Sequence, residues 1–228
     1  MSTKSAFPDR PASMSHGETS LSLLETMRWA NGIPLLDRHM KRLGSSARTL
    51  GFRFDETRIR AEIKRHCRAL AEDSAYRLRL TLSEDGEVAL TSSELDPQKK
   101  AFEEAGVHPE PFDINHVLRG FKTTRREMYE VPYRQATELG FDEALLVDDD
   151  GQLIEGTRTN VWVLKEGVWR TPPLSSGCLE GVYRAHLLET QTETREEVLH
   201  IQDLETAEQV ALSNAVHGLV PIRVVLKA

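Results

Sequence analysis

The sequence is short of cysteine, of net positive charge and of long apolar runs. Only two cysteines, Cys67 and Cys178, occur in 228 residues, and their spacing fits neither a disulfide framework nor a metal site. We therefore expect a reducing, cytoplasmic setting and no bound metal. The net charge of −7 disfavours nucleic acid and anionic membranes as partners, because neither attracts an acidic surface. No apolar run approaches the length of a membrane span, so we expect no membrane partner.

Two polar stretches divide the chain. The first, residues 1–20, contains two prolines and lacks the apolar core of a secretory signal, so we expect a flexible lead-in. The second, Ser92 to Pro111, contains three prolines and predicts a domain boundary near Phe112. With 39% hydrophobic residues the chain can bury a sizeable core. The predicted units are a small N-terminal α/β subdomain, 21–111, and a larger C-terminal subdomain, 112–228.

Hydrophobic periodicity predicts the elements of the first unit. Apolar residues recur at helical spacing from Leu36 to Leu50, and Gly51 is suited to end that helix. Asp55 is a suitable N-cap for a second helix. Asn31-Gly32, between apolar segments, is typical of a hairpin turn. The buried stripe of the second helix is predicted to be Ile59, Ile63, Cys67 and Leu70, and alternation predicts strands over Leu21–Trp29, Tyr76–Leu82 and Glu87–Thr91.

The second unit mixes strands and helices without a regular βαβ alternation. A helix is expected to begin soon after Lys122 and to end at Leu139, with Pro132 kinking or interrupting it. Together with the first unit this pattern predicts an α+β fold in two subdomains. The other expected elements are strands at Glu143–Val147, Val161–Leu164, Val198–Ile201, Val210–Leu212 and Ile222–Leu226, a helix at Gly181–Glu189, and an acidic helix between the third and fourth of these strands.

Four short segments carry the residues of a reactive site. Lys122 lies between a glycine and two threonines, Glu155 precedes Gly156, and the turns within 175–184 and 213–218 can present backbone N–H groups to an anion. An amine, a carboxylate and two anion-binding turns are what pyridoxal 5′-phosphate (PLP) requires: a lysine for its aldehyde, a partner for its ring nitrogen and a cup for its phosphate. Each feature alone has an ordinary alternative, namely a solvated lysine, an exposed turn carboxylate or a common glycine turn.

The full set of motifs, in this order, resembles the class IV aminotransferases, which are fold-type IV PLP enzymes. The family includes branched-chain and D-amino-acid aminotransferases and 4-amino-4-deoxychorismate lyase. Lys-Thr-Thr-Arg-Arg from Lys122 and the ending Ser-Asn-Ala-Val-His-Gly-Leu-Val-Pro look most similar to the lyases, including those fused to aminodeoxychorismate synthases. The other matching segments are Leu24–Arg28, His39–Leu43, Ser46-Ala47, Glu155–Asn160, Thr171-Pro172 and Gly177–Arg184.

The resemblance implies a cofactor between the two subdomains and a role for each residue that touches it. Lys122 would bond to the PLP aldehyde, and Glu155 would keep the ring nitrogen protonated, which makes the ring an electron sink. Arg42 would bind two phosphate oxygens. Backbone N–H groups of Val182 and Tyr183 would complete one side of the phosphate cup, and Asn214 and Ala215 the other.

Substrate contacts follow less directly from the same resemblance. Arg28, Arg77 and Arg79 are candidates for the carboxylates of a substrate, although charged strand faces are usually only solvated. Thr26, Thr123 and Tyr129 are candidates to line the pocket. His217 is as well explained by a turn as by a ligand contact.

Two reactions and one non-catalytic role fit these residues. A lyase would convert 4-amino-4-deoxychorismate to 4-aminobenzoate and pyruvate, with Lys122 as the base. An aminotransferase acting on branched-chain or D-amino acids would use the same lysine to move the proton to the cofactor. We favour the lyase because of the Lys-Thr-Thr-Arg pattern and the arginine supply. The third possibility is a protein without catalytic activity that binds a synthase subunit. Lys122 and Glu155 argue against it, because a binding protein needs neither residue. The resemblance also implies a homodimer and admits an aminodeoxychorismate synthase subunit as a partner.

Overall fold

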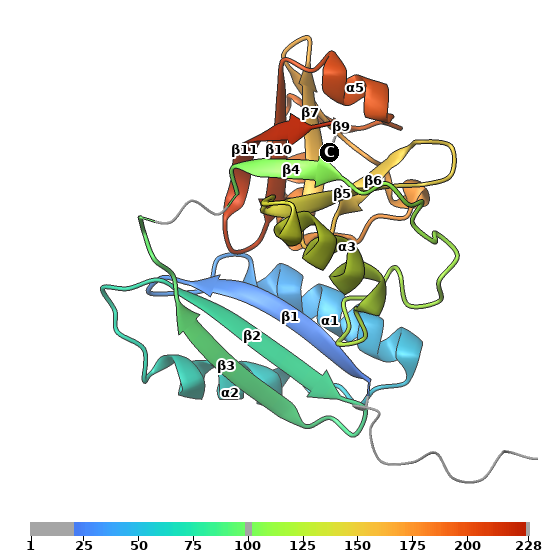
Figure 1. Ribbon diagram of the computed structural model, residues 1–228. Helices are drawn as coiled ribbons and strands as arrows, with labels where there is room; N and C mark the ends of the chain where they lie inside the picture. The colour runs from blue at the N-terminus through green and yellow to red at the C-terminus, as the bar shows by residue number, and fades with distance from the viewer. Residues whose placement is uncertain (1–20, 99–101, 227–228) are drawn as a thin grey trace, which may run out of the picture.

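The computed structural model describes residues 21–98 and 102–226, which form two sheets flanked by helices (Figure 1). The predicted lead-in, 1–20, lies outside the described residues. None of the described helices is long and apolar enough to cross a membrane. Helices and strands are mixed in both halves, so the predicted α+β class is confirmed.

The first sheet is antiparallel, with the order β1 (Ser22–Trp29), β2 (Tyr76–Ser83) and β3 (Val88–Glu94). Helices α1 (Leu36–Leu50) and α2 (Glu56–Cys67) cover one face of it (Figure 1). Alternate residues of a strand point to opposite faces. Leu78, Leu80 and Leu82 are therefore buried under the helices, while Arg77 and Arg79 lie on the open face and line a cavity.

Both predicted helices of the first half are confirmed, but α2 ends at Cys67, so Leu70, predicted on its buried stripe, lies beyond the helix. Gly51 follows α1 with φ 78°, a left-handed conformation that glycine adopts without strain. The Asp55 carboxylate accepts a hydrogen bond of 3.0 Å from the Arg58 N–H at the start of α2. Ile59 and Ile63 face the core beneath the sheet.

The predicted hairpin at Asn31-Gly32 is wrong. Strand β1 pairs antiparallel with β2, about fifty residues along the chain, and the chain enters α1 soon after Gly32. Asn31 and Gly32 do turn the chain, with φ values of 52° and 152°. The apolar residues after the turn recur at helical spacing, so no adjacent strand is available to close a hairpin.

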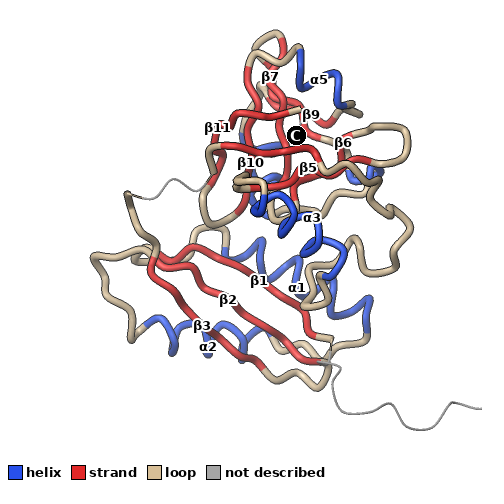
Figure 2. The backbone as a smooth tube through the Cα atoms, viewed as in Figure 1, coloured by secondary structure: helices blue, strands red, loops and turns tan. Residues whose placement is uncertain are grey.

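The second sheet has the order β6-β5-β4-β11-β10-β7-β8-β9 and curls around its own core, as the strands of Figure 2 show. Helix α3 (Glu127–Glu138) lies between this sheet and β1 (Figure 1). The remaining elements are β4 (Glu104–Val107), β5 (Glu143–Val147), β6 (Leu153–Gly156), β7 (Asn160–Lys165), β8 (Val168–Thr171), η1 (Leu174–Ser176), α4 (Val182–Thr190), β9 (Thr194–Glu196), α5 (Ile201–Glu205), β10 (Gln209–Asn214) and β11 (Gly218–Val225).

Three expectations for the second half need correction. The predicted linker contains β4, which pairs in parallel with β5 and β11, so the chain enters the second sheet at Glu104 and not near Phe112. Residues Val198–Ile201 form no strand, because the preceding segment 194–196 pairs with β8 and α5 begins at Ile201. Helix α3 continues through Pro132 to Glu138, so the predicted interruption is wrong, while the alternative, a kink at Pro132, stays a prediction. Pro132 stands at the sixth helical residue, within the part of the helix where a proline costs a backbone hydrogen bond.

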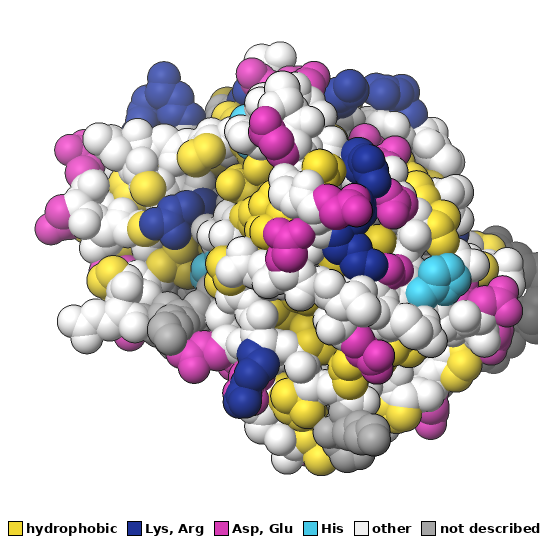
Figure 3. Space-filling model, turned by 90° about the horizontal axis from the view of Figure 1, so that it is seen from above, with side chains coloured by type: hydrophobic (Ala, Val, Ile, Leu, Met, Phe, Trp, Pro, Cys, Tyr) yellow, Lys and Arg dark blue, Asp and Glu magenta, His cyan; other side chains and the backbone are white. Residues whose placement is uncertain are grey.

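Seen from above, acidic and basic side chains are interspersed over the surface of the molecule, with hydrophobic side chains between them (Figure 3). Neither charge sign dominates this face. The concentrated positive charge of the molecule lies elsewhere, in the cavity between the two sheets.

Candidate active site

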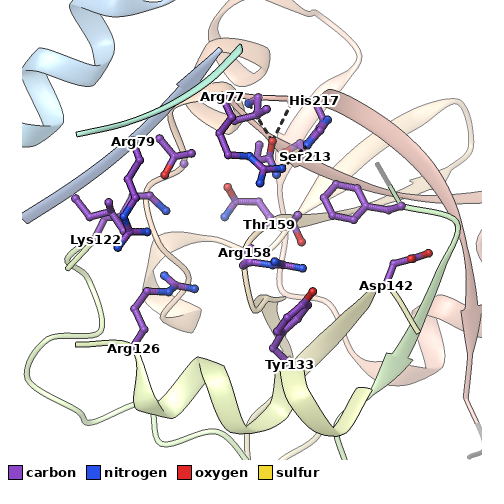
Figure 4. A pocket seen from close by; sticks show the side chains of 18 of the residues that line it. Arg77, Arg79, Lys122, Arg126, Tyr133, Asp142, Arg158, Thr159, Ser213 and His217 are labelled. Atoms are coloured by element: carbon purple, nitrogen blue, oxygen red, sulfur yellow. Dashed lines mark hydrogen bonds between the residues drawn. The ribbon is translucent and has the colours of Figure 1, made fainter. Parts of the chain in front are cut away.

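A cavity of about 940 Å³ lies where the two sheets meet. Both halves of the chain contribute to its walls: β1, α1 and β2 from the first half, and the Lys122 loop, α3, the start of α4 and the β10–β11 turn from the second (Figure 4). The sequence-predicted residues that it brings together are Thr26, Arg42, Arg77, Arg79, Lys122, Val182, Asn214, Ala215 and His217.

Lys122 is held by the backbone of the first sheet. Its carbonyl accepts a hydrogen bond of 2.8 Å from the Leu24 N–H, and the Thr124 N–H donates to the Ser22 carbonyl at 2.9 Å. Burial, followed by the nearby charges of Arg126 and Arg42, lowers the pKa of the Lys122 amine to about 7, against the opposing charges of Glu25 and Glu155. A large fraction of the amine is therefore neutral, and nucleophilic, at neutral pH.

Arg42 is fixed in the cavity wall by a buried carboxylate. Its Nε and Nη2 donate to the two oxygens of Glu25 at 2.9 and 2.6 Å, and its Nη1 donates to the Glu180 carbonyl at 2.9 Å. His39 Nδ1 contacts the same carboxylate at 2.7 Å. Burial alone would raise the pKa of Glu25, but Arg42 and His39 outweigh it and lower that pKa to about 2. Glu25 is thus ionised, and it orients the guanidinium at the cavity.

Glu155 is buried and is not among the side chains that line the cavity. Its oxygens accept hydrogen bonds from the Tyr129 hydroxyl at 3.1 Å and the Leu179 N–H at 3.0 Å. Burial raises its pKa to about 7, against the effect of these donors and of the neighbouring Lys122. A carboxylate can accept about four hydrogen bonds, so capacity remains for a further, positively charged donor, which would bring the pKa back down.

These residues fit PLP. A neutral amine, a guanidinium oriented by a carboxylate, the start of α4 and a buried carboxylate are the groups that an aldehyde, a phosphate and a pyridine nitrogen require. The turn into α4 is closely packed, because a Cβ on Gly181 would lie 1.9 Å from the Asn160 amide oxygen. A larger residue at this position would force the Asn160 side chain to shift.

Thr123 and Tyr129 do not line the pocket, contrary to the prediction. Thr123 pairs with Leu23 across an isolated bridge and is buried, with its hydroxyl donating to the Arg125 carbonyl at 3.2 Å. The next residue, Thr124, points the other way and lines the cavity. The Tyr129 hydroxyl instead donates to the Glu155 carboxylate, so Tyr129 contacts a proposed cofactor residue and not the cavity itself.

Arg28 and Tyr183 also lie apart from the main cavity. Arg28 lines a second, smaller hollow and donates to the Val216 carbonyl at 3.4 Å, because it lies further along β1 than Thr26. The Tyr183 ring packs in an apolar cluster with Trp162 and Leu187. Its neighbour Val182 lines the cavity, and a contribution from the Tyr183 N–H stays a prediction.

Several cavity residues were missed from the sequence: Thr124, Arg126, Arg158, Thr159, Asn160 and Ser213. The segment Gly156-Thr157-Arg158-Thr159-Asn160 was recognised as a motif, but no role was given to its arginine. Nor was the buried Glu143 singled out, although it accepts hydrogen bonds from the N–H groups of Thr157 and Arg158, both at 3.1 Å. A lone carboxylate at a strand start gives no sequence signal of this role.

Comparisons with known proteins agree with this geometry. The family described as amino-transferase class IV matches residues 22–225. The chain belongs to that family. Members use PLP, and a solved relative is the PLP-bound form of a "hypothetical aminotransferase" from Mycobacterium tuberculosis, with 19% identity, a TM-score of 0.77 and coverage of 89% of this chain and 81% of that one. At this identity the likeness shows the fold alone.

Individual class IV relatives carry the names of two different activities. A "Putative aminodeoxychorismate lyase" of Schizosaccharomyces pombe is 29% identical over 206 residues, or 85% of each chain. A "Putative amino-acid aminotransferase" structure from Mesorhizobium loti is 33% identical, with a TM-score of 0.83, and covers 90% of this chain and 100% of that one. A "Putative branched-chain-amino-acid aminotransferase" of Methanocaldococcus jannaschii is 37% identical over 92 residues, which are 39% of this chain and only 32% of that protein. This chain is therefore a PLP-dependent class IV enzyme.

Proposed function

We propose that the enzyme is a lyase that converts 4-amino-4-deoxychorismate to 4-aminobenzoate and pyruvate. The observation that carries this proposal is the arginine wall of the cavity. Arg77, Arg79 and Arg158 line it, and none of the carboxylates in the described residues forms an ion pair with them. Guanidinium groups without carboxylate partners suit a substrate with two negative charges. The similarity to the S. pombe protein over most of both chains supports the same reaction.

In this proposal the chain holds PLP at both ends. Lys122 would bond to the aldehyde, and Arg42, the start of α4 at Val182 and the turn at Asn214-Ala215 would bind the phosphate. Glu155 would accept a hydrogen bond from the protonated ring nitrogen. When bound, PLP supplies an electron sink that stabilises negative charge on a substrate carbon.

Lys122 then acts as the base. Its neutral Nζ would take the proton from the substrate carbon that bears the amino group, for which a pKa near 7 is suited. The bond between the ring and the enolpyruvyl oxygen breaks, the enolpyruvate gains a proton and becomes pyruvate, and the ring becomes aromatic. The reaction balances without an oxidant or a co-substrate.

A coupled assay tests the proposal. The PLP-loaded enzyme is mixed with aminodeoxychorismate synthase, chorismate and glutamine, and 4-aminobenzoate is measured by chromatography. We expect 4-aminobenzoate to accumulate with the wild-type enzyme and not with Lys122→Ala. A wild-type enzyme that retains PLP and yields no 4-aminobenzoate would refute the proposed reaction.

An amino-acid aminotransferase is the second candidate, favoured by the similarity to the M. loti protein over its whole length. The same Lys122 would return the proton to the cofactor, and the amino group would stay there. Exchange of amino groups between alanine or branched-chain amino acids and 2-oxoglutarate, in the absence of lyase activity, would support this candidate. Both assays can be run on one preparation.

A further inference from the structure

Arg158 is held in the cavity by a ring and by a buried carboxylate. Its guanidinium carbon lies 3.6 Å from the centroid of the Tyr133 ring, on the face of the ring (Figure 4). Its backbone N–H donates to Glu143 at 3.1 Å, and the same carboxylate accepts a hydrogen bond of 3.2 Å from the Thr159 hydroxyl. Glu143 thus fixes the loop that carries Arg158, and stacking on Tyr133 fixes the Arg158 side chain.

Stacking leaves the hydrogen-bond donors of Arg158 free. A guanidinium that lies on an aromatic face still presents its N–H groups in the plane, where they can bind a carboxylate at two points. No carboxylate of the described chain pairs with it. Arg126 differs, because it donates to the Thr157 carbonyl at 2.6 Å and contacts Glu130 at 3.5 Å. Arg42 differs too, since it is paired with Glu25.

Arg77 and His217 extend the same positive region. Arg77 Nη2 lies 3.5 Å from His217 Nε2. Burial, followed by the charges of Arg77, Arg28 and Arg158, lowers the pKa of His217 to about 4. His217 is therefore neutral at neutral pH and can accept from Arg77 at one nitrogen while its other nitrogen donates. In Figure 4 this group lies across the cavity from Lys122.

Five acidic residues line the same cavity, and four of them have partners other than Arg158 and Arg77. Asp96 accepts a hydrogen bond of 2.9 Å from the Gln98 N–H, and Glu127 is exposed. Asp142 accepts hydrogen bonds from the Glu103 and Glu104 N–H groups at 2.8 and 3.1 Å, and Glu130 contacts Arg126. Glu94 accepts from the Ser74 hydroxyl at 2.6 Å. None of these contacts involves Arg158 or Arg77, so the positive charges of these two arginines are left for a ligand.

We infer that Arg158, together with Arg77 and His217, forms a subsite for the substrate carboxylate that lies away from the amino-bearing carbon, and that Arg158 makes the enzyme select dicarboxylates over monocarboxylates. This inference rests on the proposed function, because it assigns one of the two carboxylates of a dianionic substrate. It adds a residue, Arg158, that determines which amino compounds the cavity accepts.

Binding of unreactive probes tests the subsite without turnover. Benzene-1,3-dicarboxylate and benzoate are titrated into PLP-loaded enzyme, and their dissociation constants are measured by calorimetry. We expect the wild type to bind the dicarboxylate more tightly than benzoate. Arg158→Gln should weaken dicarboxylate binding by about ten-fold, because one charged hydrogen-bonding contact at an open site contributes roughly that factor. Benzoate binding should change by less than about two-fold. Tyr133→Leu, which removes the stacking surface, should give a smaller loss with the same selectivity.

Arg134→Gln is the matched control, because Arg134 is an exposed arginine of the same helix as Tyr133 and pairs with Glu138 outside the cavity. It should leave both dissociation constants unchanged. The absorbance of bound PLP and the thermal unfolding of each variant verify that the site and the fold persist. In the coupled assay Arg158→Gln should raise KM by about the same factor and leave kcat nearly unchanged, as expected for a contact made equally before and during the reaction.

The subsite is refuted if wild type binds the two probes alike, or if Arg158→Gln weakens both equally or neither. Failure of the lyase proposal has a different signature. If the wild type makes no 4-aminobenzoate but its preference for the dicarboxylate is lost in Arg158→Gln, the subsite stands and serves another dicarboxylate.

Discussion

At the scale of single residues, the chemistry depends on charges placed around Lys122. Burial and two guanidinium groups disfavour its ammonium form, while Glu25 and Glu155 oppose them. Glu25 acts mainly on Arg42, with which it shares two hydrogen bonds. The same buried carboxylate therefore fixes a proposed phosphate ligand and moderates the charge beside the amine.

The pH dependence of Lys122 reactivity follows from this environment. Only the neutral amine is nucleophilic, so its acylation should rise with pH through a midpoint of about 7 and then level off. An ordinary solvated lysine gains reactivity up to about pH 10. Competitive labelling of the PLP-free protein with acetic anhydride, read by mass spectrometry, measures this, with the exposed Lys41 as an internal reference. A midpoint near that of a solvated lysine would contradict the assigned environment.

Glu25→Gln should weaken the retention of PLP. The amide removes one charge from a buried pair and leaves Arg42 less firmly oriented, so we expect the dissociation constant of PLP to rise by about ten-fold or more. Pyridoxal, which has no phosphate, should be affected much less. Equilibrium binding of both compounds makes the comparison, with Glu62→Gln, a surface ion-pair residue on α2, as the control. Equal losses for PLP and pyridoxal would point to a general structural defect.

What the sequence predicts at this scale depends on whether a residue acts through a motif or through packing. Lys122 and Arg42 stand in recognisable motifs, and the structure brings both to one cavity. Glu25 and Glu143 are each a carboxylate in a strand, and only tertiary contacts show that each holds a loop or a guanidinium. Thr123 was assigned in place of Thr124 because a bridge to β1 decides which of two adjacent side chains faces the cavity.

At the scale of elements, the loop before α3 connects the two halves. Its backbone bonds to β1, whereas α3 packs against β5 of the second sheet. The position of Lys122 is therefore fixed by both sheets. Strong periodicity predicted α1, α2 and β2 accurately. Strands β4, β6 and β8 have only four residues each, too few for a clear alternation, and β6 is buried on both faces.

Removing one hydrogen bond between this loop and β1 tests whether these bonds position Lys122. Thr124→Pro deletes the N–H that donates to Ser22, whereas Thr124→Val keeps it and loses only the hydroxyl that accepts from the Ser22 N–H at 3.0 Å. We expect Thr124→Val to cost about 1 kcal/mol of unfolding free energy, and Thr124→Pro to abolish covalent PLP binding while the protein remains folded. Chemical denaturation and the absorbance of bound PLP give the two readouts. A proline variant that binds PLP normally would show that these bonds do not position Lys122.

At the scale of the whole molecule, the cavity exists only where the two sheets meet. Arg42, Arg77 and Arg79 come from the first half and Lys122, Arg158 and His217 from the second, so neither half contains the site. The mixed acidic and basic side chains on the surface in Figure 3 contrast with the arginine wall inside. Negative substrates are thus attracted by the cavity and not by the outer surface as a whole.

The assembly of the enzyme stays a prediction. The resemblance to homodimeric relatives predicts a particle of twice the chain mass in solution, and light scattering coupled to gel filtration measures it. A particle of one chain mass with full activity would contradict the predicted homodimer. Association with an aminodeoxychorismate synthase subunit would add to that mass when the two proteins are mixed.

The central claim, that the Lys122 amine bonds to the PLP aldehyde in this cavity, is tested most directly by borohydride reduction of the PLP-loaded enzyme followed by peptide mapping. Reduction makes the bond permanent, so mass spectrometry identifies the lysine that carries the pyridoxyl group. We expect a single adduct, on Lys122, and loss of that adduct in Lys122→Ala. An adduct on another lysine, or a protein that PLP cannot label at all, would contradict it.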